Sequence, residues 1–275
     1  MTEAVEIRRL DGEGSATAAD AIAVEEPLEI RVGGRSIAVT MRTPGHDAEL
    51  ATGFLLTEGV VRSAADIVEV AHCESGQARQ TGNVINVFLA AGVEVDFQRL
   101  TRHVFASSSC GLCGKAAIDA VIQTHPQVNS SLRISAAILE SLPEKLRASQ
   151  KAFDATGGLH AAAIFDVTGR MLVAREDVGR HNAVDKVIGW ALQQGMTPLN
   201  ALVLLVSGRV SYEIVQKALA AGLPLICAVS APTSLAVELA RESGLTLVGF
   251  LRGRTMNLYS GAWRVAGEND GRVDP

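Results

Sequence analysis

The chain has 275 residues, of which 48% are hydrophobic and 20% are charged. This composition is typical of a folded globular protein, and the length allows one large domain or two smaller ones. The formal net charge of −5 argues against broad binding of nucleic acid or of an anionic membrane surface, because both require a positive field. The first residues lack the apolar stretch of a secretory signal, and no run of about 18 apolar residues predicts a membrane span. Only four cysteines occur, so we expect a cytoplasmic protein with reduced thiols.

The first part of the chain predicts a small α+β domain over residues 21–105, preceded by a flexible tail over residues 1–20. Strand-like segments at 28–32 and 35–43 flank Gly33 and Gly34, which accept the positive φ of a tight hairpin turn. A helix follows, with Pro44 and Asp47 at its start and Gly59 at its end. Residues 66–73 and 83–90 predict two further strands.

The second part predicts an α/β domain over residues 106–275. A helix is expected from residue 114 to Pro126, and a second helical segment over 134–153 is expected to be interrupted at Pro143. A hairpin follows over 160–176. Helices and strands then alternate: helix 182–195, strand 201–208, helix 211–222, strand 223–230, helix 232–244 and strand 245–253. Such alternation predicts a mostly parallel sheet.

Three strand-to-helix turns are expected at one edge of this sheet, at residues 175–186, 206–213 and 229–236. Their Ser, Thr and Asn side chains either cap the helices or, with the free backbone N–H groups, hold a phosphate. Two of the turns contain an arginine, Arg180 or Arg209, and this favours an anionic ligand. Among the histidines, His181 is the best candidate for a hydrogen-bonding or proton-transferring residue, ahead of His160 and His103.

Arg252 and Arg254 flank Gly253 directly after the last predicted strand. Two guanidinium groups in this arrangement can grip a phosphate. The alternative is a solvated basic loop, which needs no ligand.

Cys110 and Cys113 lie among glycines and serines in "SSSCGLCGK". Four interpretations are open: a disulfide, half of a metal site, a redox couple, and a nucleophile that carries a group. A disulfide is disfavoured in a reducing compartment, and one C-x-x-C supplies only two of four zinc ligands. The start of the following helix and Lys115 favour the thiolate, which can attack a persulfide and carry its terminal sulfur.

A zinc deaminase also stays open. His72 and Glu74, followed by Cys110 and Cys113, have the order H-x-E…C-x-x-C of zinc deaminases. However, Ser109 stands where that signature has proline, and Glu74 is followed by a loop rather than by a helix.

Longer segments resemble the FdhD-type accessory sulfurtransferases of formate dehydrogenase, the FdhD/NarQ family. The resemblance extends from about Pro27 to Trp263, and it rests on "TPGHDAELATGFLLTEG", "SSSCGLCGK", "TGGLHAAA", "EDVGRHNAVDKVIG", "SGRVSYEIVQKA" and "SAPTSLAVELA".

The resemblance implies a cytidine-deaminase-like fold with a mixed sheet and flanking helices. It implies a cytoplasmic sulfur carrier that accepts sulfur from a cysteine desulfurase as a persulfide and passes it to Mo-bis(molybdopterin guanine dinucleotide) for formate dehydrogenase. Cys110 would carry the persulfide and Cys113 would assist. The cofactor-binding residues would be Phe250, Leu251, Arg252, Gly253, Arg254 and Thr255, to which the residue analysis adds Arg180, His181 and Arg209.

Two points stay open at this stage. A cofactor-binding chaperone would need the anion-binding turns but not the cysteines. The apolar helix faces are compatible with a homodimer.

Overall fold

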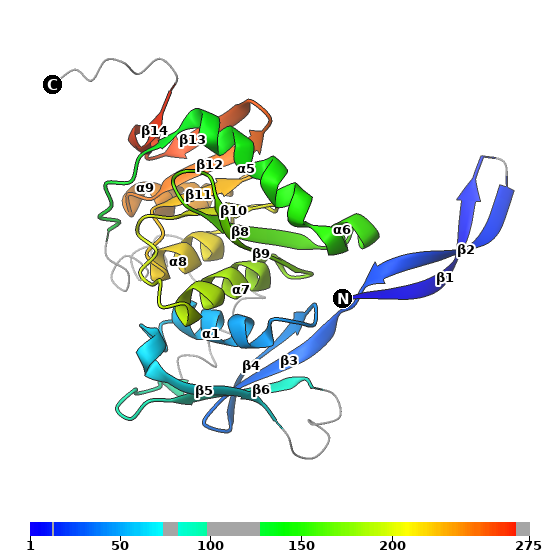
Figure 1. Ribbon diagram of the computed structural model, residues 1–275, viewed down its shortest axis with the longest axis horizontal. Helices are drawn as coiled ribbons and strands as arrows, with labels where there is room; N and C mark the ends of the chain where they lie inside the picture. The colour runs from blue at the N-terminus through cyan, green and yellow to red at the C-terminus, as the bar shows by residue number, and fades with distance from the viewer. Residues whose placement is uncertain (13, 74–81, 98–126, 268–275) are drawn as a thin grey trace.

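The computed structural model of the chain describes residues 1–12, 14–73, 82–97 and 127–267 (Figure 1). Cys110 and Cys113, the helix predicted after residue 114 and the predicted domain boundary at residue 105 lie outside the described residues. Within the described part, no helix is long and apolar enough to cross a membrane.

A four-stranded sheet forms the first part of the body. It contains β3 (Glu26–Val32), β4 (Arg35–Arg42), β5 (Ile67–His72) and β6 (Val84–Leu89) in the order β4-β3-β6-β5. Gly33 and Gly34 make the β3–β4 turn with φ values of 55° and 83°, as predicted. Alternate residues Leu28, Ile30 and Val32 are buried, and α1 (Asp47–Thr57) lies against this sheet.

A six-stranded mixed sheet forms the second part. Its strands are β8 (His160–Phe165), β9 (Met171–Asp177), β10 (Val203–Val206), β11 (Leu225–Ala228), β12 (Thr246–Arg252) and β13 (Thr255–Ser260). The order is β13-β12-β11-β10-β8-β9, and only the β10–β11 and β11–β12 pairs are parallel. The mixed sheet with flanking helices is therefore confirmed. The mostly parallel sheet is wrong, because a hairpin at each end adds antiparallel pairs.

Helices cover both faces of this sheet. α7 (Arg180–Gln193), α8 (Tyr212–Ala220) and α9 (Ser234–Glu242) pack on the face of Ala162 and Ile164, in a core that continues into the first part of the chain. α5 (Ala136–Ser149) packs on the opposite face, and α6 (Lys151–Thr156) follows it. The short strands β7 (Ile134–Ser135) and β14 (Val265–Ala266) pair beside α5.

The predicted interruption at Pro143 is wrong, because α5 runs through this residue and ends before Gln150. Proline removes one backbone donor from a helix. The side chains of Leu139, Leu142 and Leu146 are almost completely buried on both sides of Pro143. We attribute the continuity of the helix to this packing.

The flexible tail predicted for residues 1–20 is also wrong. β1 (Thr2–Asp11) and β2 (Gly14–Ala23) form an antiparallel hairpin, here called the arm, which projects from the body (Figure 1). The pairing extends from Thr2↔Ala23 to Asp11↔Gly14. The small residues that suggested a loose tail are mostly the alanines of β2, a residue type with low strand propensity.

The helices α1 and α7 cross between the two sheets at a pair of glycines (Figure 1). A Cβ added at Gly53 would lie 1.9 Å from the backbone oxygen of Asp185, and one added at Gly189 would lie 1.8 Å from the backbone oxygen of Glu49. Only glycine allows backbones to approach this closely. The crossing therefore fixes how the two parts of the chain pack.

Gly53→Ala and Gly189→Ala should each lower the free energy of unfolding by about 2 kcal/mol or more, because the added methyl group must force the helices apart. In a helix with free space at this position, the same change would raise the free energy of unfolding by about 0.5–1 kcal/mol. The sign of the change therefore shows whether the two backbones are in close contact. Urea unfolding followed by circular dichroism measures the effect. Gly158→Ala is the control, because its nearest atom would be 3.8 Å away. A neutral or stabilising result at both crossing positions would contradict the tight crossing.

Candidate functional site: a cationic sheet edge

The candidate site lies where four strands end at the same edge of the six-stranded sheet. β10, β11 and β12 are parallel, and β9 points the same way because both β9 and β10 are antiparallel to β8. The segments that follow these strands therefore meet, as predicted for residues 175–186, 206–213 and 229–236. His160, the first residue of β8, lies there too, since it pairs with Asp177.

Hydrogen bonds hold the loops of this edge together. The Ser207 hydroxyl oxygen accepts from the N–H of Ala161 at 2.8 Å. The N–H of Phe250 donates to the Ser230 carbonyl at 3.1 Å. A Cβ at Gly208 would lie 3.2 Å from Nδ1 of His160, so this loop passes close to the imidazole.

Positive charge gathers around His160, which is about half buried. Burial lowers the pKa of His160 below its ordinary value, and the charges of Arg180, Arg209 and His181 lower it further. Nε of Arg180 is buried and has no hydrogen-bond partner among the described residues. The site thus joins Arg180, His181 and Arg209, which sequence reasoning selected, and adds His160, which it ranked lower. Such an edge favours a multiply charged anion.

His181 has a carboxylate partner that sequence reasoning missed. Its Nε2 lies 2.8 Å from Oε2 of Glu213 and 3.2 Å from the hydroxyl oxygen of Ser211. The hydrogen bond from His181 lowers the pKa of Glu213. Glu213 lies in the first turn of α8, where a carboxylate is favourable on its own account, so no sequence pattern pairs it with His181.

The segment from Phe250 to Thr255 is the tip of a β-hairpin rather than a loop after the last strand. It contains the end of β12, the turn at residues 253–254 and the first residue of β13. Phe250 has a φ of 52°, in a region that favours glycine, at an irregularity in the β12–β13 register. Its side chain is partly exposed, whereas Leu251 is buried in the core. Gly253 makes the turn with a φ of 52°, and the Thr255 hydroxyl donates to the Arg252 carbonyl at 3.0 Å.

The structure does not bring the guanidinium groups of Arg252 and Arg254 together. Nε of Arg252 donates to the Val229 carbonyl at 2.9 Å, and its guanidinium lies 5.7 Å from the centre of the Phe250 ring. Arg254 is 85% exposed, and its Nε lies 4.0 Å from a carboxylate oxygen of Glu140 on α5. Only Arg252 therefore contacts the loops of the edge.

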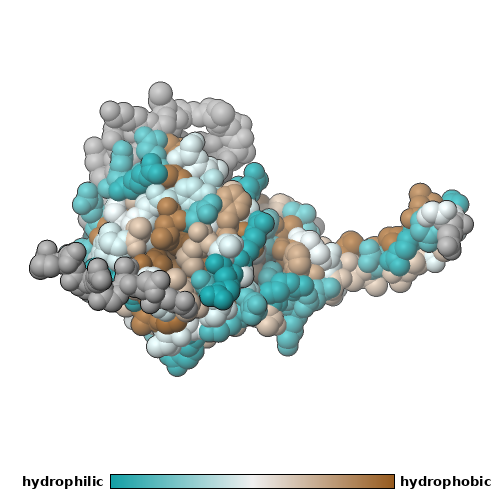
Figure 2. Space-filling view, turned by 90° about the horizontal axis from the view of Figure 1, so that it is seen from above, coloured by the Kyte–Doolittle hydropathy of each residue, from teal (hydrophilic) through white to brown (hydrophobic). Residues whose placement is uncertain are grey.

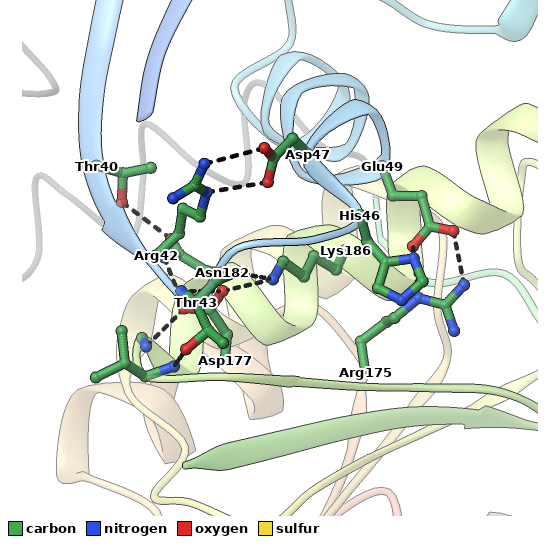
Figure 3. Close-up of polar contacts among 12 residues, drawn as sticks. Thr40, Arg42, Thr43, His46, Asp47, Glu49, Arg175, Asp177, Asn182 and Lys186 are labelled. Carbon is green, nitrogen blue, oxygen red and sulfur yellow. Dashed lines mark hydrogen bonds and ion pairs between the residues drawn. The ribbon is translucent and has the colours of Figure 1, made fainter. Parts of the chain in front are cut away.

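A buried carboxylate behind the edge connects it to the first part of the chain (Figure 3). Asp177 is completely buried and lies 2.7 Å from Nζ of Lys186. Its other contacts are with Asn182, the N–H of Gly179 and the N–H of Thr43. The Thr43 hydroxyl oxygen accepts from the N–H of Val178, and the Thr43 carbonyl accepts from Lys186. The segment "TPGHDAE" thus holds the start of α7.

Two further ion pairs surround this carboxylate (Figure 3). Arg42 donates to both carboxylate oxygens of Asp47, at 3.0 and 3.1 Å. Arg175 donates to both carboxylate oxygens of Glu49, at 2.6 Å each. His46 precedes α1 with a φ of 59°. These pairs fix the position of α1 and belong to the framework rather than to the edge.

The described residues contain no cluster of three or more His, Cys, Asp or Glu side chains arranged to bind a metal ion. His72 lies 3.6 Å from a carboxylate oxygen of Asp47, while Glu74 of the H-x-E pattern lies outside the described residues. Burial raises the pKa of the Cys227 thiol, so Cys227 is not a reactive thiolate.

The fold and the edge together define an α/β protein with arginine side chains gathered at one edge of its large sheet. The profile of the FdhD/NarQ family matches residues 23–266, and the chain belongs to this family.

Named relatives agree with this assignment. The chain is 54% identical over 269 residues to "Sulfur carrier protein FdhD" of Nocardia farcinica, covering 96% of this chain and 92% of the relative. It is 51% identical over 271 residues to the protein of the same name in Streptomyces avermitilis, covering 97% and 96%. A crystal structure of a protein assigned as a formate dehydrogenase accessory protein from Desulfotalea psychrophila superposes with a TM-score of 0.77 at 24% identity, covering 96% of this chain and 99% of that one. This last likeness supports the fold.

Arg180→Gln should raise the pKa of His160, because a nearby positive charge that lowers it is lost. Arg209→Gln should act in the same direction. NMR titration of the imidazole measures both effects, with Arg62→Gln as a control on the exposed surface of the first part of the chain. An unchanged His160 pKa in both edge variants would contradict the inference that Arg180 and Arg209 lie close to the His160 imidazole.

Proposed function

We propose that this protein is a sulfur carrier that accepts sulfur from a cysteine desulfurase as a persulfide on Cys110 and delivers it to Mo-bis(molybdopterin guanine dinucleotide), in support of formate dehydrogenase. The observation that carries the proposal is the 54% identity, over 96% of this chain, to a protein named as a sulfur carrier. We expect it to act in the cytoplasm, where thiols stay reduced, and as a homodimer.

The loading step is a thiol–disulfide type of exchange. The Cys110 thiolate attacks the terminal sulfur of the persulfide on the desulfurase cysteine. A new sulfur–sulfur bond forms on Cys110, the old one breaks, and the desulfurase leaves as a thiolate. No net oxidant or reductant is needed. Cys113 is proposed to assist the onward transfer.

The cationic edge supports the proposed binding of the guanine dinucleotide cofactor. A guanine dinucleotide carries phosphate groups, and arginine is suited to bind them. Arg180, Arg209 and Arg252 lie on strand-end segments that meet at the edge, and the partly exposed Phe250 ring can stack on a base. We assign residues 250–255 to cofactor binding. Arg254, directed to α5 by its contact with Glu140, is assigned a smaller part.

A cofactor-binding chaperone without sulfur transfer is the remaining alternative, because the same edge would serve it. It differs in one respect, namely that it would not need Cys110. The zinc-deaminase alternative is not favoured, since the named relatives are sulfur carriers.

Incubation with a cysteine desulfurase and free cysteine should add one sulfur atom to the protein, removable by a reductant. Intact-protein mass spectrometry detects the added mass. Cys110→Ala should abolish the gain, whereas Cys227→Ser, at a buried thiol, should leave it unchanged.

The same variants distinguish carrier from chaperone. If Cys110→Ala still supports formate dehydrogenase activity in a strain that lacks the native protein, the carrier role fails and the chaperone is favoured. If the wild-type protein gained no sulfur, the carrier role would also fail and the chaperone would be favoured.

Arg252→Ala should weaken GDP binding about tenfold or more, because a charge-assisted hydrogen bond to phosphate contributes about 1.5–3 kcal/mol. Arg254→Ala should have the smaller effect. Isothermal titration calorimetry measures both, with Arg62→Ala as the control. If the double variant Arg252→Ala/Arg254→Ala bound GDP as the wild type does, the assignment of residues 250–255 would be withdrawn.

A further inference from the structure

The imidazole of His160 lies at the cationic edge without a partner among the described residues. No hydrogen bond or ion pair joins its ring to another group there. Its two ring nitrogens also remain accessible to solvent, since neither belongs to the completely buried polar atoms that have no partner. The imidazole is therefore free to contact a ligand that reaches the edge.

His160 is held close to the segments that contain the edge arginines. It begins β8 and pairs with Asp177 at the end of β9. A Cβ added at Gly208 would lie 3.2 Å from Nδ1 of His160 and 3.8 Å from Cβ of Arg180, so the loop after β10 is close to both side chains. The next residue of this loop is Arg209. The imidazole thus lies near two arginines that come from different segments.

Two carboxylates lie near this group of cations, and both already have partners. Asp177 accepts hydrogen bonds from two backbone N–H groups, from the Asn182 amide and from Lys186. Four donors occupy the lone-pair sites of both its oxygens. Glu213 contacts His181 at 2.8 Å. Neither carboxylate is therefore left to bind a protonated imidazole at position 160.

The charges that act on His160 are mostly positive. Burial, Arg180, Arg209 and His181 lower its pKa, and Asp177 raises it by less than any of these lowers it. α7 and α8 also begin at the edge without a side-chain cap, and the start of a helix repels a positive charge. The arm extends away from the body (Figure 2) and its main contacts with the body are with α6, so it adds no charge to this set. Without a ligand, the imidazole is neutral at pH 7.

We propose that His160 takes up a proton when a nucleotide binds at the edge, and that the resulting imidazolium donates a hydrogen bond to a phosphate oxygen. The proton comes from solvent and returns to solvent when the nucleotide leaves, and no other bond forms or breaks. The negative charge of the phosphate offsets the charges of the two arginines, which otherwise repel the proton. The inference rests on the proposed binding of the guanine dinucleotide at this edge, and it does not depend on sulfur transfer by Cys110.

Proton uptake makes the affinity depend on pH in one direction. Because the complex binds this proton more tightly than the free protein does, the contribution of His160 is fully present below the pKa of the free protein. It is lost as the pH rises through the pKa of the complex. Between these two values, the dissociation constant should rise by up to about tenfold per pH unit. Loss of the proton thus favours release of the cofactor, which a delivery protein requires.

Isothermal titration calorimetry of GDP in buffers of different ionisation enthalpy measures the number of protons taken up. At neutral pH the wild type should take up more protons than His160→Gln, since glutamine cannot be protonated. The terminal phosphate has its own second pKa near about 6, and His181 also lies at the edge, but both groups are present in the two proteins. His72→Gln is the matched control, because His72 contacts Asp47 in the first part of the chain. This control should match the wild type.

NMR titration of the His160 imidazole tests the same point without a variant. Saturating GDP should raise the pKa of His160 above its value in the free protein. Guanosine, which has the base and the sugar but no phosphate, should leave this pKa unchanged. A rise as large with guanosine as with GDP would overturn the proposed contact with phosphate.

Two further results would overturn the inference while leaving nucleotide binding intact. One is equal proton uptake by the wild type and His160→Gln. The other is a His160 pKa that bound GDP does not change. If GDP did not bind at all, this inference and the assignment of the edge to cofactor binding would both fail. Failure of persulfide formation on Cys110 would affect the carrier role alone.

Discussion

The buried carboxylate of Asp177 is the contact on which the arrangement of the site depends. It receives hydrogen bonds from the N–H groups of Thr43 and Gly179 and lies 2.7 Å from Nζ of Lys186. These donors come from the segment before α1, from the turn between β9 and α7, and from α7 itself. A buried ion pair need not add net stability, but removing one partner leaves a buried charge and costs about 3–5 kcal/mol. The pair therefore specifies one geometry for three segments.

α7 is held at two points, and these contacts determine where its first residues lie at the edge of the large sheet. Asp177 fixes its first turn, while Gly189 fixes its middle against Gly53 of α1. Arg180 and His181 are the first two residues of α7, so their backbone position follows directly from these contacts. The first sheet and α1 contribute no arginine to the edge, yet they determine where two of its cations lie.

The sequence predicted those parts of the fold that depend on local pattern. Gly33 and Gly34 predict their hairpin, and the apolar runs predict the buried strands and the turns that follow them. The errors arose where tertiary contacts decide. β2 is rich in alanine and becomes a strand only through its pairing with β1. Pro143 stays helical because of packing around it. The partnership of His181 with Glu213, 32 positions later, leaves no local signal.

The distribution of paired and unpaired cations explains how a chain with a net charge of −5 can still have a cationic region at one sheet edge. The buried lysines are neutralised, Lys186 by Asp177 and Lys217 by Asp185. At the edge, by contrast, no carboxylate lies within ion-pair distance of Arg180, Arg209 or Arg252 among the described residues. Burial, Arg180, Arg209 and His181 each lower the pKa of His160 by more than Asp177 raises it, so the charge of Asp177 offsets the field of the edge cations only in part. Net charge describes the whole surface, whereas binding responds to the few charges that the fold leaves unpaired in one place.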